Sequence, residues 1–153
     1  MAEYSANAVQ IVNPGETVIF TESPVPCKRG FVRHRDDTGN FLLSGWVPRK
    51  SCGCKADSAL YLIDFGANIS IPTGGTVEAI SVAFTIDGAT IPSSTMIVTP
   101  AALNEYFNIS AAVNASIWNG CCESFAVRNT SSQPIQIQNA NIIFTRPDLA
   151  ITY

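Results

Sequence analysis

The chain has 153 residues, of which 46% are hydrophobic and only 14% are charged, and its formal net charge is -3. This length predicts one domain spanning residues 1–153, and a weakly negative charge gives no reason to expect nucleic-acid binding. Soluble domains usually carry about 25% charged residues, so the low charge favours either permanent association or a sticky monomer surface. The N-terminus has no basic region or long apolar run, so we expect cytoplasmic synthesis without a signal peptide and no membrane insertion.

The first third of the chain predicts short strands separated by turns. Two brief apolar runs lie within residues 9–20, and residues 23–27 contain two prolines, which exclude this passage from a central strand. Residues 31–35 and 41–45 flank the sequence Asp36-Asp37-Thr38-Gly39-Asn40. Because such loops connect antiparallel strands, we predict a hairpin there.

The middle of the chain has the clearest alternation of apolar and polar residues. One face holds the odd-numbered residues Tyr61, Ile63, Phe65, Ala67, Ile69 and Ile71, and the even-numbered residues from Asp64 to Ser70 are small or polar. A similar run at 79–86 ends at Asp87-Gly88. This dipeptide predicts a hairpin to a partner strand that ends near Val98. The proline-led stretch that follows predicts at most one short helix, near residues 100–106.

The last third repeats the strand pattern with one irregularity. Residues 107–118 alternate, and the turn residues Asn119-Gly120 follow them. In the final run Ile135 and Ile137 are odd-numbered, but Ala140, Ile142 and Phe144 are even-numbered. This change of parity predicts either a β-bulge near Gln138-Asn139 or two separate strands. About ten short strands of this kind predict an all-β, antiparallel two-sheet sandwich.

The second face of the long strands is small and neutral where an ordinary solvent-facing sheet carries Lys and Glu. Small neutral residues allow close approach, and interface cores are depleted in charge. We therefore favour an oligomer interface over a solvated Ser/Thr/Asn-rich face. The candidate interface residues are Tyr61, Asn68, Ser110, Ala112, Asn114, Trp118, Gln136 and Gln138.

The five cysteines do not form a familiar metal-binding pattern. Cys-x-Cys at Cys52 and Cys54 and the adjacent pair Cys121-Cys122 are poor matches to zinc-site spacings. We expect reduced thiols in a protein made in the cytosol. The alternative is a disulfide from Cys27 to Cys52 or Cys54.

No motif for catalysis is present. The chain lacks a Gly-x-Ser-x-Gly elbow, a phosphate loop and a His-Glu-x-x-His helix. Its single histidine, His34, is interpreted as a strand residue, and Asp64 as a strand-end acid or as half of an ion pair with an arginine of another subunit. We therefore expect no enzyme activity, no catalytic residues, no cofactor and no metal.

The basic residues are concentrated in one part of the chain. Seven of the nine lysines and arginines lie between positions 28 and 55. This segment predicts solvated loops or, alternatively, a patch that binds an anionic glycan or an acidic capsid surface. The candidate ligand-facing residues are Arg33, Arg35 and Trp46, because arginines bind anions and an exposed tryptophan stacks on sugar rings.

The last three predicted strands resemble the jelly roll shared by tumour necrosis factor and the globular heads of complement subunits, especially its bacterial and phage versions. The matching sequences are Asn119-Gly120, Phe125-Ala126-Val127-Arg128, Asn129-Thr130-Ser131 and Asn141-Ile142-Ile143-Phe144-Thr145-Arg146. Further upstream, Phe84-Thr85-Ile86-Asp87-Gly88 looks like a hairpin of the same fold.

This resemblance implies a jelly-roll sandwich that forms a compact homotrimer on a virion or a bacterial cell surface. Such domains serve as head fibres or decoration proteins of phage, or as tips of surface filaments. The expected partners are further copies of the chain and a capsid or surface-filament protein. The chain lacks Gly-X-Y repeats, so a stalk would come from another protein. The alternative function is a carbohydrate-binding β-sandwich with Trp46 or Trp118 as its sugar platform; a hydrolase has no residue support.

Overall fold

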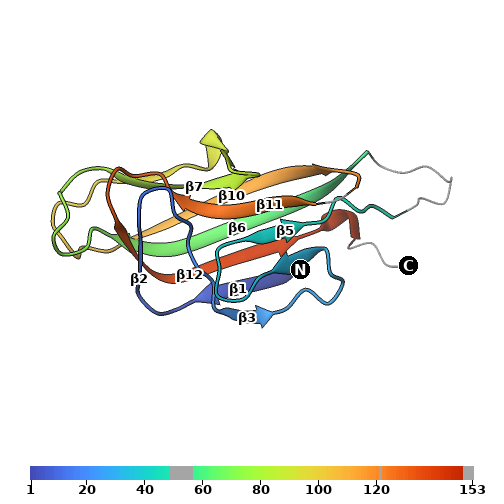
Figure 1. Ribbon diagram of the computed structural model, residues 1–153, viewed down its shortest axis with the longest axis horizontal. Helices are drawn as coiled ribbons and strands as arrows, with labels where there is room; N and C mark the ends of the chain where they lie inside the picture. Colours follow the sequence, from blue (N-terminus) through green and yellow to red (C-terminus); the bar gives the residue numbers. More distant parts are fainter. Residues whose placement is uncertain (49–56, 121, 150–153) are drawn as a thin grey trace.

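The computed structural model describes residues 1–48, 57–120 and 122–149 and consists of antiparallel strands in two layers (Figure 1). The strands are β1 (Ala2–Ala6), β2 (Gln10–Val12), β3 (Glu22–Val25), β4 (Val32–His34), β5 (Phe41–Leu43), β6 (Ser58–Ser70), β7 (Ile80–Ile86), β8 (Ala89–Thr90), β9 (Met96–Val98), β10 (Phe107–Trp118), β11 (Glu123–Asn129) and β12 (Ile135–Thr145). Two single 3-10 turns, η1 (Pro92–Ser94) and η2 (Pro147–Leu149), complete the assigned elements. The predicted all-β class is confirmed.

The order of the strands defines two sheets. The first sheet runs β10-β6-β12-β1-β3, with β2 also paired with β12. The second sheet runs β4-β5-β11-β7-β8, with β9 paired with β7. The proline-containing strand β3 lies at an edge, as a missing backbone N–H requires.

The core lies between the two sheets and is rich in phenylalanine. Phe41 of the second sheet lies 4.8 Å from Phe144 of the first, measured between ring centroids, and Phe65 lies 6.1 Å from Phe84. These side chains are at most 3% exposed. Aromatic contacts between the layers therefore hold the sandwich together, because each ring removes a large apolar area from water.

The predicted irregularity near Gln138-Asn139 is a β-bulge. The pairing of β12 with β6 shifts register between Gln138 and Asn141, and Asn139 has a φ of 55°. Asparagine tolerates this left-handed conformation better than most residues. The extra residue explains why buried side chains change from odd to even positions along β12.

Both predicted hairpin turns are confirmed, but the partner strand predicted to end near Val98 is divided into β8 and β9, which are separated by η1 and both pair with β7. Asp87 and Gly88 have φ values of 49° and 82° and connect β7 to β8. Two consecutive positive φ angles match the right-handed twist of the flanking strands. Residues 36–40 likewise connect β4 to β5.

The predicted short helix near residues 100–106 is wrong. The chain forms turns there, because the Glu105 carboxylate accepts hydrogen bonds from the backbone N–H groups of Ala101 and Ala102 at 3.1 and 3.2 Å. Asn104 has a φ of 58°, which a right-handed helix cannot contain, and its N–H donates to the carbonyl of Ile71.

Candidate functional site

The outward side of the first sheet is the most extensive candidate site. Strands β6 and β10 pair without interruption from Ser58 opposite Trp118 to Ile69 opposite Phe107, and β12 flanks β6 on the other side. Because side chains alternate along a strand, one set enters the core and the other forms a continuous outer face. We call this surface the neutral face. Its residues are Leu60, Leu62, Asp64, Gly66, Asn68, Asn108, Ser110, Ala112, Asn114, Ser116, Trp118, Gln136, Gln138, Asn141, Ile143 and Thr145.

The neutral face carries almost no charge. Asp64 is the one charged residue within the three strands, and no lysine or arginine occurs in them. Asp64 is exposed and lies opposite Ala112 on one side and Ile143 on the other. Covering this face would therefore remove a single charge from water in each subunit, which keeps the desolvation cost low.

The two ends of the neutral face differ in chemistry. At one end Leu60, Leu62 and Trp118 are 40%, 37% and 72% exposed. Exposed apolar side chains gathered on one face of a sheet are typical of interaction surfaces. This end can therefore contribute apolar burial to an interface.

The other end is a row of amide side chains that runs across strands. Asn108 Nδ2 donates to Asn68 Oδ1 at 3.1 Å, and Asn68 Nδ2 donates to Asn139 Oδ1 at 3.4 Å. Gln136 Nε2 also donates to the hydroxyl of Tyr106. Amide groups keep unused donors and acceptors after such pairing, so this end can form hydrogen bonds with a second surface.

Seven of the eight interface candidates lie on the neutral face, namely Asn68, Ser110, Ala112, Asn114, Trp118, Gln136 and Gln138. Tyr61 does not, and its nomination was wrong. It is fully buried, because it has the odd-numbered parity of Ile63 and Phe65, and its hydroxyl lies 2.9 and 2.6 Å from the carbonyls of Phe31 and Ser44.

Sequence reasoning missed three apolar members of the neutral face. Leu60, Leu62 and Ile143 have the parity of the neutral residues and lie on the same side of the sheet. Their parity was readable from the sequence. Only the pairing of β6 with β12 brings Ile143 beside Asp64.

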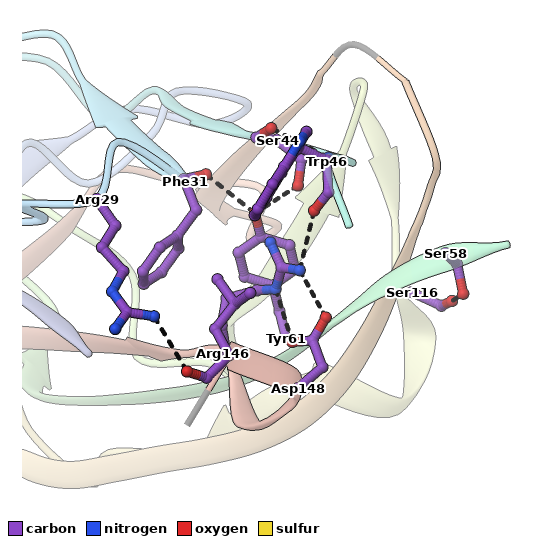
Figure 2. A network of polar contacts seen from close by, with 10 residues as sticks. Arg29, Phe31, Ser44, Trp46, Ser58, Tyr61, Ser116, Arg146 and Asp148 are labelled. Atoms are coloured by element: carbon purple, nitrogen blue, oxygen red, sulfur yellow. Dashed lines mark hydrogen bonds and ion pairs between the residues drawn. The ribbon is translucent and has the colours of Figure 1, made fainter. Parts of the chain in front are cut away.

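A buried arginine closes one end of the sandwich (Figure 2). Arg146 follows β12 and is 2% exposed. Its Nε and Nη2 donate to the two carboxylate oxygens of Asp148 at 2.8 and 2.6 Å, and Nη2 also donates to the carbonyl of Trp46 at 3.0 Å. The guanidinium carbon lies 4.9 Å from the ring centroid of Tyr61. Burial of this charge is tolerated because a carboxylate and an aromatic face both contact it.

The Arg146 cluster perturbs the ionisation of its members. Burial opposes the charge of Arg146, but the hydrogen bonds to Asp148 and Tyr61 outweigh it and raise the arginine pKa. Burial is also the main reason that the pKa of Tyr61 is raised, and the nearby arginine only partly offsets it. These directions are those of a buried structural cluster, because Arg146 is 2% and Tyr61 0% exposed.

Solved structures share this architecture at low sequence identity. The globular domain of the zebrafish complement 1qA protein superposes with a TM-score of 0.58 at 9% identity, covering 93% of this chain and 94% of that one. Eiger, a TNF from S. frugiperda, gives 0.63 at 12% identity with 99% and 93% coverage. Murine APRIL gives 0.52 at 12% identity with 92% and 97% coverage. No protein-family model matches the sequence, and no curated protein matches it significantly.

The fold is a jelly roll like those of TNF and C1q. At identities of 9 to 12% these similarities establish the fold alone. The jelly-roll part of the predicted resemblance is therefore confirmed, and the bacterial or phage type stays a prediction.

In this jelly roll the ligand-facing candidates lie in two places. Arg33 and Arg35 are exposed beside Leu42 on the outer side of the second sheet and line one surface hollow. Trp46 is 57% exposed and does not line that hollow; its carbonyl belongs to the Arg146 cluster (Figure 2).

The remaining predictions concern cysteines, metals and membranes. Cys27 is a half-buried free thiol, so the structure lacks the alternative disulfide from Cys27, and Cys52 and Cys54 lie outside the described residues. Within the described ranges no three His, Cys, Asp or Glu side chains lie close enough to hold a metal ion. No helix in the described part of the chain has the length and apolar character of a membrane span.

Proposed function

We propose that the chain is a non-enzymatic, single-domain interaction module that forms a homotrimer through the neutral face. We further propose that it belongs to a phage virion, as a head fibre or decoration protein, or to a bacterial surface assembly. A capsid or surface-filament protein would be the partner that holds it. The TNF- and C1q-like fold supports the interaction role, and the neutral face supports the assembly.

The observation that carries this proposal is the composition of β6, β10 and β12. Thirty-six residues in three adjacent strands include a single charged side chain, Asp64. Charged side chains on a sheet that faces solvent stay hydrated and cost nothing, so such a sheet has no reason to lack them. Charged side chains in an interface must lose their water, so interfaces contain few of them. A stable interface needs about 800 Å² from each partner, and a face made of long adjacent strands can supply an area of that order.

The first test is light scattering coupled to size exclusion at low protein concentration, with and without reductant. We expect three times the subunit mass of 16.4 kDa in both conditions. A monomer would contradict the proposal. A trimer that dissociates on reduction would assign assembly to intermolecular disulfides instead of the neutral face.

A matched pair of variants connects the assembly to the neutral face. Ala112→Arg adds charge and bulk at its centre, while Ala89→Arg makes the same change at an exposed position in β8. In the free subunit an arginine at position 112 can lie beside Asp64, so we expect folding to be retained. We expect Ala112→Arg to dissociate the trimer and Ala89→Arg to leave it intact. Equal behaviour of the two variants would exclude the neutral face as the interface.

A second candidate function, carbohydrate binding, is supported by the placement of the two tryptophans. A Cβ atom on Gly45 would lie 1.9 Å from the carbonyl oxygen of Trp118, so the chain at Gly45 runs directly against the end of β10. Trp46, which follows Gly45, is 57% exposed, and Trp118 is 72% exposed. An exposed indole can stack on a sugar ring. This function predicts a change in tryptophan fluorescence with a neutral glycan, and an unchanged spectrum across a broad glycan panel would exclude it.

A further inference from the structure

A hollow on the outer side of the second sheet has a chemistry distinct from that of the neutral face. It has a volume of about 450 Å³ and lies over the neighbouring strands β4, β5 and β11. The backbone register places Arg33 opposite Leu42 and Leu42 opposite Ser124, so these three side chains form one row across the strands. Arg35 and Asn40 line the same hollow from the β4–β5 hairpin. Strand pairing, and not loop conformation alone, therefore holds this group together.

The hollow contains two guanidinium groups without a carboxylate partner. Among the described residues the only ion pair joins Arg146 to Asp148, so neither Arg33 nor Arg35 is paired. Asp37 of the adjacent turn lines a different hollow, which it shares with Glu16. The two hollows meet at Asn40, and neither Asp37 nor Glu16 lines the one that holds the arginines. With no ion pair to either guanidinium group among the described residues, both remain available to a ligand.

The remaining lining combines apolar and polar groups. Leu42 is 37% exposed and forms an apolar floor between Arg33 and Ser124. The Ser124 hydroxyl donates to Asp87 Oδ1 at 3.1 Å, which leaves its oxygen lone pairs able to accept a hydrogen bond. The backbone N–H of Asn40 lies 3.3 Å from the hydroxyl of Thr38. That contact holds Asn40 at the rim of the hollow, and the Asn40 side-chain amide supplies both a donor and an acceptor.

We propose that this hollow binds an acidic saccharide, with the carboxylate of a uronic or sialic acid between Arg33 and Arg35 and the sugar ring over Leu42. A guanidinium matches a carboxylate with two parallel hydrogen bonds. The C–H face of a pyranose ring covers an apolar side chain, and the sugar hydroxyls reach Asn40 and Ser124. All of these groups come from one chain, so the site does not depend on the proposed trimer.

The ring contact favours an acidic sugar over an acidic peptide. An aspartate or glutamate side chain would satisfy the arginines but would leave the exposed part of Leu42 and the hydroxyl-binding groups unused. A sugar acid uses the charged, polar and apolar parts of the hollow together. A neutral sugar would leave both guanidinium groups without a counter-charge.

The test is isothermal titration of the full chain with sialyllactose and a glucuronate oligosaccharide, with lactose and an oligoglutamate peptide as comparison ligands. We expect at least one acidic sugar to bind more tightly than lactose and oligoglutamate, and binding to weaken with salt because the arginines are exposed. Arg33→Gln or Arg35→Gln should weaken it by roughly tenfold to a hundredfold, since hydrogen bonds to charged groups are lost. Tighter binding of oligoglutamate, or equal binding of lactose, would overturn the proposal.

One control variant and one further site variant separate the hollow from general charge effects. Arg29→Gln removes an exposed charge outside the hollow and should leave binding within about twofold, because distant exposed charges are screened. Leu42→Ala should weaken binding of the acidic sugar several-fold, because part of the apolar contact with the sugar ring is lost. Circular dichroism checks that this variant keeps its fold. If Arg29→Gln weakens binding as much as Arg33→Gln, or if Leu42→Ala has no effect, the proposed site is wrong. Because these variants leave the neutral face unchanged, their outcome is independent of the subunit mass.

Discussion

The Arg146 cluster allows a quantitative prediction about stability. Arg146 and Asp148 form a forked pair in which the arginine side chain is 1% exposed and the aspartate side chain 28% exposed. The two partners therefore differ in what their removal leaves behind. Replacing Asp148 leaves a charge buried without its carboxylate, whereas replacing Arg146 leaves a carboxylate that water can reach.

We expect Asp148→Asn to lower the free energy of unfolding by about 3 kcal/mol, the lower end of the cost of breaking a buried ion pair. Arg146→Met should cost only about 2 kcal/mol, because methionine fills part of the space, no buried charge remains and Asp148 becomes hydrated. Arg146 also donates to the carbonyl of Trp46 at 3.0 Å, and the methionine variant loses this bond. The double variant should cost less than the sum of the two single changes, since the residues interact directly.

Urea unfolding at one fixed protein concentration measures these differences, because an oligomer gains stability with concentration. Arg146→Lys is the matched control: it keeps the charge but replaces the fork by a single ammonium. A loss below about 1 kcal/mol for Asp148→Asn, against the range expected for a buried pair, would refute the reasoning. So would a larger loss for Arg146→Met than for Asp148→Asn.

Two further predictions concern residues in and beside the core. Burial raises the pKa of both Tyr4 and Tyr61. Their contribution to the free energy of unfolding is therefore complete below the ordinary tyrosine pKa of about 10 and is lost as pH rises through the higher pKa values of the folded state. The urea midpoint should decrease as the pH is raised through that alkaline range, and an unchanged midpoint would contradict this assignment. Gly45→Ala would place a Cβ 1.9 Å from the carbonyl oxygen of Trp118. Thermal unfolding should therefore show that the free energy of unfolding is lower by about 1–3 kcal/mol. A variant as stable as the original chain would show that the backbone can move apart here.

Much of the strand pattern was predictable because alternation is a local property. The odd-numbered apolar residues of β6, the Asp87-Gly88 turn and the change of parity beside Asn139 each depend on a few neighbouring residues. Local patterns failed where a side chain redirected the backbone. The carboxylate of Glu105 captures two backbone N–H groups, and turns form where a proline-led sequence predicted a helix.

The sequence by itself determined that the chain is all-β, that its long strands have one apolar and one neutral side, and that charge is scarce along them. Only the tertiary structure decided which strands are neighbours, because β1 pairs with β12 through contacts between opposite ends of the chain. In the second sheet, the pairing of β4, β5 and β11 aligns Arg33, Leu42 and Ser124 across three strands. The fold also buries Arg146 beside Asp148. Alternation assigns a residue to one side of its own strand, whereas a site depends on which other strands lie beside it.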